Sequence, residues 1–106
     1  MAIYDDFARL DIRVATVKEV ERVPGSRKLY KLKVDLGDEE RTLVAGLAGY
    51  YTEEELRGKR VIVVANLEPK KIMGVESQGM LLAADDGENV ALLVPDRDVR
   101  PGAKVR

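Results

Sequence analysis

Apolar and polar residues alternate along much of the chain, and this alternation predicts strands. In Leu29–Leu36 every second residue from Tyr30 onward is apolar, with charged residues between them. A period of two is typical of a strand that buries one face. Asp11–Val23 is also predicted as a long strand, but its apolar spacing slips from two to three, which indicates a β-bulge or strong coiling.

The rest of the chain divides into short strands and turns in the same way. Turn signals occur at Pro24-Gly25-Ser26, Gly37-Asp38 and 85–89. The predicted strands are Arg41–Ala45, Lys59–Leu67 with apolar residues on both faces, Met80–Ala84 and Val90–Val94. Residues 70–79 are predicted to be an irregular loop or a bulged segment.

Two short helices are expected. Thr52 is placed to cap a helix, with Glu55 at the capping-box position and Gly58 ending it after little more than one turn. A second short helix at residues 5–10 would be capped by Asp5 or Asp6. Five or six strands without a long crossover helix predict an all-β OB-fold, a five-stranded Greek-key barrel with the short helix between strands 3 and 4.

Composition narrows the functional classes. The 106 residues suit a single domain over 1–106, and they contain no Cys and no His. This excludes thiol nucleophiles, histidine acid–base chemistry and thiolate or imidazole zinc sites, so we expect no catalysis, cofactor or metal. The acidic N-terminus is no signal peptide and no apolar run could span a membrane, so a cytoplasmic location is expected.

The net charge of −1 requires any nucleic-acid site to be local. The most informative segment is 66–82, in which Lys70 and Lys71 could neutralise phosphates. Asn66 and Ser77 could hydrogen-bond phosphate, ribose or base edges. By composition alone, a charged surface loop whose glycines serve only turns is the simpler interpretation.

A second basic stripe is formed by Lys28, Lys31 and Lys33, of which Lys31 and Lys33 share one strand face, with Arg13 expected on a neighbouring strand. It could follow an RNA backbone, although an ordinary solvated strand face is again the simpler interpretation. Aromatic residues are sparse, and Tyr30 belongs to the apolar set of its strand. Folded RNA read by shape and phosphate therefore suits the chain better than an open single strand.

The combined motifs resemble the tRNA-binding domain family from about Asp6 to the C-terminus. The family includes free-standing dimeric bacterial proteins and the C-terminal domain of many methionyl-tRNA synthetases. The resemblance rests mainly on Asn66-Leu67-x-Pro69-x-Lys71 and Gly74-Val75-Glu76-Ser77-Gln78-Gly79-Met80, with support from 7–14, Lys28-Leu29-Tyr30, 34–37 and Gly46-Leu47.

The resemblance implies an OB barrel with N- and C-terminal extensions, and recognition of tRNA by shape with little sequence preference. It places RNA contacts at Lys33, Asn66, Lys70, Lys71, Ser77 and Met80. Met80 would touch a ribose or base, or else support the site from the core. Partners implied are tRNA, a second copy joined through the terminal extensions including 90–105, and an aminoacyl-tRNA synthetase.

The sequence departs from the family pattern at two places. Many members have His-Pro-x-Ala-Asp before Lys-Leu-Tyr, where this chain has Val23-Pro24-Gly25-Ser26-Arg27, and the frequent Ser-Gly-Leu is Ala45-Gly46-Leu47 here. A related export-associated chaperone family shares the fold but lacks the Ser-x-Gly-Met pattern. A protein-binding, chaperone-like homodimer therefore remains the alternative.

Overall fold

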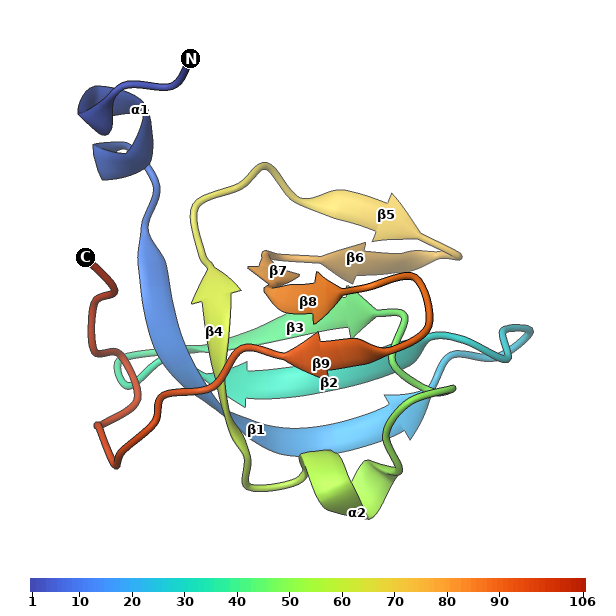
Figure 1. The fold of residues 1–106 in the computed structure, drawn as a ribbon. Helices are drawn as coiled ribbons and strands as arrows, with labels where there is room; N and C mark the ends of the chain where they lie inside the picture. Colours follow the sequence, from blue (N-terminus) through green and yellow to red (C-terminus); the bar gives the residue numbers. More distant parts are fainter.

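Strand β1 is the central strand of the barrel sheet, because it pairs with both β2 and β4. The computed structural model describes residues 1–106. Five strands form one antiparallel sheet in the order β3-β2-β1-β4-β7, curled into a nearly closed barrel, and two separate hairpins, β5–β6 and β8–β9, complete the fold (Figure 1). The elements are α1 Tyr4–Ala8, β1 Ile12–Arg22, β2 Tyr30–Asp35, β3 Glu40–Ala45, α2 Glu53–Leu56, β4 Arg60–Val64, β5 Lys70–Ile72, β6 Val75–Ser77, β7 Met80–Leu81, β8 Ala83–Asp85 and β9 Val90–Leu92. The predicted OB-type barrel is confirmed, with α2 between β3 and β4.

The predicted slip in β1 is a bulge opposite β2. Val17 pairs with Val34, and the next pair is Glu19 with Lys33, so Lys18 is the extra residue. Before the bulge, β1 pairs with β4, and beyond it β1 continues along β2. The bulge increases the local coiling that allows one strand to serve both sides of a small barrel.

The barrel interior is filled by the apolar face that the alternation predicts. Tyr30, Leu32, Val34 and Leu36 are all buried, and β4 is buried on both faces from Val61 to Val64. The outer face of β1 and β4 is covered by the C-terminal segment, where Val99, Ala103 and Val105 pack on a second apolar cluster made of Ile12, Val14, Ile62 and Val64.

Helix α2 forms as its sequence predicts. The Thr52 side chain accepts a hydrogen bond from the Glu55 backbone N–H at 3.1 Å, and the Glu55 carboxylate accepts one from the Thr52 N–H at 2.8 Å. This reciprocal pair satisfies two of the unpaired donors at the helix start. Neither helix is long and apolar enough to cross a membrane.

The predicted cap of the first helix is wrong. The residue at the cap is Ile3, and Asp6 lies inside the first turn, where its carboxylate accepts a hydrogen bond from the Ile3 backbone N–H at 3.1 Å. A carboxylate at this position satisfies the same donor and favours the positive end of the helix, so the acidic residues stabilise α1 from within.

Residues 70–79 are more regular than the sequence predicts. They contain the β5–β6 hairpin, in which Ile72 pairs with Val75 across a two-residue turn. Met73 and Gly74 both have positive φ, 48° and 82°, as a tight mirror-image hairpin turn requires. Methionine seldom adopts this conformation, so Met73 is not a usual turn signal.

The predicted strands after residue 79 are also shorter than expected. Met80–Ala84 divides into β7 and β8, because the chain leaves β4 after two paired residues and turns back to pair with β9. The last predicted strand, Val90–Val94, ends at Leu92.

Candidate nucleic-acid interface

The closing segment, Ser77-Gln78, hydrogen-bonds the edge of β3 as a further strand would and thereby closes the barrel. Gln78 donates its backbone N–H to the Thr42 carbonyl at 2.8 Å, and its side-chain Oε1 accepts from the Thr42 N–H at 3.0 Å. The Ser77 hydroxyl accepts from the Val44 N–H at 3.0 Å and donates to the Gly79 carbonyl at 3.1 Å. These bonds satisfy edge groups of β3 that would otherwise be buried without a partner.

Gly79 allows the same segment to approach β4 closely. Its φ is 147°, and a Cβ at this position would lie 2.9 Å from the Val64 carbonyl oxygen and 3.1 Å from Leu43 Cδ2. Only glycine fits this combination of backbone conformation and contact. Ser77-Gln78-Gly79, one of the most specific motifs of the sequence, therefore has a structural role that its residue types alone do not reveal.

Asn66 holds the N-terminal segment against the end of β4. Its side-chain Oδ1 accepts from the Asp11 backbone N–H at 2.8 Å, and its Nδ2 donates to the Arg9 carbonyl at 2.7 Å. Both bonds fix the linker between α1 and β1. The predicted role of Asn66 and Ser77 in binding RNA stays a prediction, and any such contact must use hydrogen-bonding capacity left over from these bonds.

An apolar groove of about 440 Å³ lies beside the closing segment. Its walls come from the end of β3, the β5–β6 hairpin, β7 and the β8–β9 hairpin, and it contains Leu47, Leu67, Ile72 and Met80. Lys70 and Ser77 also line it. No aromatic ring lines the groove, and Tyr30 is buried with its hydroxyl bound to the Tyr51 carbonyl.

Three of the predicted site residues are exposed around this groove. Lys70 faces it from β5, Lys71 faces the opposite side of the same strand, and Met80 is 49% exposed at its rim. Neither lysine forms an ion pair with a carboxylate. Met80 was expected either at the surface or in the core, and in the structure it lies at the surface.

The other three predicted residues do not share this site. Lys31 and Lys33 lie on the outer face of β2, each paired at 3.4 Å with a glutamate of β1, Glu21 and Glu19 respectively. Arg13 hydrogen-bonds both carboxylate oxygens of Asp11 and reaches a second carboxylate on the β2–β3 turn. Compensated charges of this kind contribute little positive potential to the surface.

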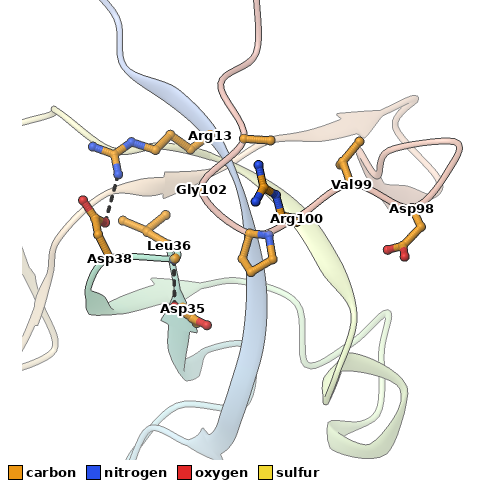
Figure 2. A pocket seen from close by; sticks show the side chains of 11 residues that line it. Arg13, Asp35, Leu36, Asp38, Asp98, Val99, Arg100 and Gly102 are labelled. Carbon is orange, nitrogen blue, oxygen red and sulfur yellow. Dashed lines mark hydrogen bonds and ion pairs between the residues drawn. The ribbon is translucent and has the colours of Figure 1, made fainter.

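Arg13 lines a different and more open cavity of about 890 Å³, between the β2–β3 turn and residues 98–103. Figure 2 shows Arg13 directed toward Asp38 at 3.2 Å, with Arg100 on the facing C-terminal segment. Gly37 and Gly102 lie close together, because a Cβ on Gly102 would be 2.4 Å from the Leu36 carbonyl oxygen and 3.5 Å from Gly37 Cα. This cavity shares no residue with the groove.

The perturbed carboxylates stabilise local structure outside the groove. The hydrogen bond from Arg13 lowers the pKa of Asp11 below its ordinary value, and Asp11 raises the pKa of Arg13. The Thr52 backbone N–H lowers the pKa of Glu55, and the backbone N–H groups of Asn89 and Glu88 lower that of Asp86. Asp11 lies just before β1, Glu55 lies in α2, and Asp86 lies in the turn between β8 and β9.

Sequence reasoning missed Arg41. Its guanidinium hydrogen-bonds Glu39 and the Ala65 carbonyl, and it lies 3.4 Å from the Gln78 carbonyl. It thereby links β3, the end of β4 and the closing segment. No local pattern marks it, because its partners come from distant parts of the chain.

A family model described as "Putative tRNA binding domain" matches residues 12–104. The chain belongs to the tRNA-binding domain family. The chain is 68% identical to part of the methionine–tRNA ligase of Pyrococcus horikoshii, over 103 residues that cover 97% of this chain and 14% of the ligase. It is 57% identical to part of the Thermotoga maritima ligase, over 95% of this chain and 16% of that protein. The chain thus spans a small share of the relatives' length.

Solved structures similar to this chain include proteins that it covers almost completely. A "MetRS related protein" from Pyrococcus horikoshii has a TM-score of 0.94 and 44% identity, covering 100% of this chain and 98% of that one. The CsaA chaperone of Picrophilus torridus has a TM-score of 0.93 and 38% identity, with both chains covered in full. The resemblance drawn from the motifs, and the fold it implies, are confirmed.

Proposed function

We propose that this tRNA-binding domain binds folded tRNA without catalysing a reaction, either within a methionyl-tRNA synthetase or as a free-standing protein. The observation that carries the proposal is that Lys70 and Lys71 are exposed on β5 without ion pairs, with Lys70 and the half-exposed Met80 lining one groove. Lys70 and Lys71 attract phosphates, and Met80 contacts a ribose or base. The cytoplasm is the compartment in which tRNA is charged, so the cytoplasmic location expected from the sequence agrees with this function.

The absence of an aromatic surface in the groove supports recognition of folded RNA. Proteins that hold open single strands stack bases on accessible aromatic rings. Here the groove has aliphatic walls, and its charged lining residues are Lys70, which suits a phosphate, and Glu68. Shape and phosphate contacts therefore carry the interaction, with little preference for base sequence.

The proposed working form is a homodimer joined through the terminal extensions. No residue of α1 is buried, and Ile3, Tyr4 and Phe7 are exposed on a helix that projects beyond the barrel (Figure 1). Leu93 and Val94 are exposed after β9. Apolar side chains on a projecting helix favour association, because a second copy would remove them from water.

A titration with three RNAs tests the proposal. Binding is measured to folded tRNA, to the same tRNA unfolded and to a single-stranded RNA of equal length, each at several salt concentrations. We expect tightest binding to folded tRNA and a log–log salt slope of about 0.7 to 0.9 for each phosphate contacted. Absence of binding at low salt would refute the proposal.

Sedimentation tests the dimer separately. We expect Phe7→Glu to shift the protein to monomer, because it places a charge on the apolar face of α1. Arg9→Glu, on the exposed C-terminal end of the same helix, is the control and should remain dimeric. A dimer that persists in Phe7→Glu would exclude α1 from the interface.

A chaperone-like function is the second candidate. The aliphatic groove and the likeness to CsaA chaperones favour it, since an unfolded peptide could place apolar side chains in the groove. A fluorescent apolar peptide that binds the groove independently of salt, in a protein that does not bind tRNA at low salt, would favour this function over RNA binding.

A further inference from the structure

Helix α1 projects beyond the barrel and has few polar links to it (Figure 1). None of its residues is buried, and neither its two aspartates nor Arg9 forms an ion pair. One hydrogen bond joins residues 1–10 to the rest of the chain, from Asn66 Nδ2 to the Arg9 carbonyl at 2.7 Å. The direction of α1 therefore depends on this bond and on the linker that follows it.

The bond from Asn66 falls on the end of the helix. Arg9 is the C-cap residue of α1, and its carbonyl is one that no N–H of the helix can reach. The other half of the same amide, Asn66 Oδ1, accepts from the Asp11 N–H at 2.8 Å, and the Ala65 N–H donates to the Asp11 carbonyl at 2.7 Å. One side chain thus bridges the end of α1 and the start of β1, so it sets the angle between them.

The turn that carries Asn66 is itself fixed to the barrel. Ala65 is buried, and its carbonyl accepts a hydrogen bond from the Arg41 guanidinium. The same guanidinium lies 3.4 Å from the Gln78 carbonyl of the closing segment. Because the backbone beside Asn66 is held by β3, its side chain can hold a projecting helix in place rather than move with it.

We propose that Asn66 is a positioning residue for α1, which holds the helix at the angle that the homodimer requires and supports tRNA binding only through the dimer, without touching RNA. The inference rests on the proposed function and changes the role that the family resemblance gives to Asn66. Its basis is that a helix without these bonds would have to be ordered again whenever two copies associate. Two joined copies present two RNA-binding surfaces to one polyanion, which strengthens binding through avidity.

Sedimentation over a dilution series tests the effect on the dimer. Asn66→Ala removes both bonds, and we expect the dissociation constant of the dimer to rise at least about 10-fold, because both helices lose their hydrogen bonds to the barrel. Asn66→Asp keeps the acceptor for Asp11 and loses only the bond to Arg9, so it should weaken the dimer even if Asn66→Ala does not fold. Gln78→Ala is the matched control, since this amide accepts from the Thr42 N–H and binds nothing in the linker, and its dimer should match the wild type.

A double-mutant cycle tests whether Asn66 touches RNA. Affinity for folded tRNA is measured for the wild type, Asn66→Ala, Phe7→Glu and their combination, and thermal unfolding checks that each protein folds. Since Phe7→Glu is expected to be monomeric already, adding Asn66→Ala should change its affinity less than about 2-fold. A direct hydrogen bond from Asn66 to RNA would instead cost about 5- to 10-fold in the monomer and in the wild type alike.

The outcomes separate this inference from the proposed function. A dimer of wild-type strength in both Asn66 variants, or an equal loss of tRNA affinity in the two backgrounds, would overturn the inference and leave the proposed tRNA binding intact. If the wild-type protein does not bind tRNA at low salt, the proposed function fails, while sedimentation still decides whether Asn66 positions α1. If Phe7→Glu remains dimeric, α1 lies outside the interface and the inference fails.

Discussion

Two pairs of lysines on two strands differ in what surrounds them. Lys31 and Lys33 lie on β2 and each contacts a glutamate of β1 at 3.4 Å, whereas Lys70 and Lys71 lie on β5 and form no ion pair. In the sequence the two pairs look equally able to bind phosphate. Glu76 of β6 lies opposite Lys71 but forms no ion pair with it, so the charge available to a ligand depends on whether a carboxylate on the neighbouring strand reaches the lysine.

The bulge at Lys18 decides the outcome for the first pair. Because Lys18 is left out of the pairing, Glu19 lies opposite Lys33 and Glu21 opposite Lys31. Without the bulge, the regular register after Val17 would place Lys18 opposite Lys33. A slip of one residue would thus exchange an ion pair for a repulsion between two lysines.

The largest expected effect comes from reversing the charge of the second pair. Lys70→Glu with Lys71→Glu should abolish tRNA binding, a loss of at least about 100-fold, while sedimentation shows an intact dimer. Neutral variants sharpen the comparison. Lys70→Gln/Lys71→Gln should weaken binding about 10-fold and Lys31→Gln/Lys33→Gln less than about 3-fold, since Lys31 and Lys33 are already compensated by glutamates. Equal losses in the two neutral variants would remove the distinction between the pairs.

The hairpin can act only where the closing segment holds it. Ser77→Ala removes, from a buried side chain, the acceptor of the half-buried Val44 N–H, so we expect the free energy of unfolding to fall by about 1 to 3 kcal/mol. Ser26→Ala is the matched control, because water can replace its more exposed bonds. Urea denaturation measures both, and a Ser77→Ala protein as stable as the wild type would show that the hydroxyl does not contribute to closure.

A smaller effect is expected from releasing the first lysine pair. Glu19→Gln with Glu21→Gln leaves Lys31 and Lys33 without carboxylate partners. If these lysines lie near bound RNA, affinity should rise about 3-fold and the salt slope should increase. Filter binding at low and moderate salt measures both. Unchanged binding would place the outer face of β2 away from the RNA.

The smallest expected effect concerns pH and lies outside both pairs. The pKa of Asp11 is lowered in the folded state by Arg13, so its stabilising contribution is present above the ordinary aspartate pKa of about 4 and is lost as pH falls through the lower folded value. Asp11→Asn should therefore show a slightly weaker decrease in stability between about pH 5 and 2 than the wild type. Parallel pH profiles of the two proteins would contradict this role.

Much of the fold was predictable because alternation and turn chemistry act locally. The bulge of β1, the buried face of β2 and the capping box at Thr52 all follow from neighbouring residues. The β5–β6 hairpin was not predicted, since its turn uses Met73 at positive φ rather than a typical turn residue. The strand β7 was not predicted as a separate strand either, because it has only two residues, both paired with β4.

The candidate site was less predictable for a different reason. Polar residues that bind a ligand and polar residues that close a barrel have the same composition. Asn66 and Ser77 fix the backbone, whereas Lys70, Lys71 and Met80 remain exposed around the groove. Only the positions of their partners, far away in the sequence, separate the two kinds of residue.

The sequence by itself determined the OB-type barrel, the family and the segment 66–80 as its most distinctive part, because local periodicity and motif spacing encode these. The tertiary structure decided which lysines are paired with glutamates. It also decided that Gln78 hydrogen-bonds the edge of β3 as a strand would, and that the β1–β2 connection contacts the hairpin at Met73. These properties depend on register and on contacts between distant segments, and a one-residue shift in pairing would change them without altering the composition.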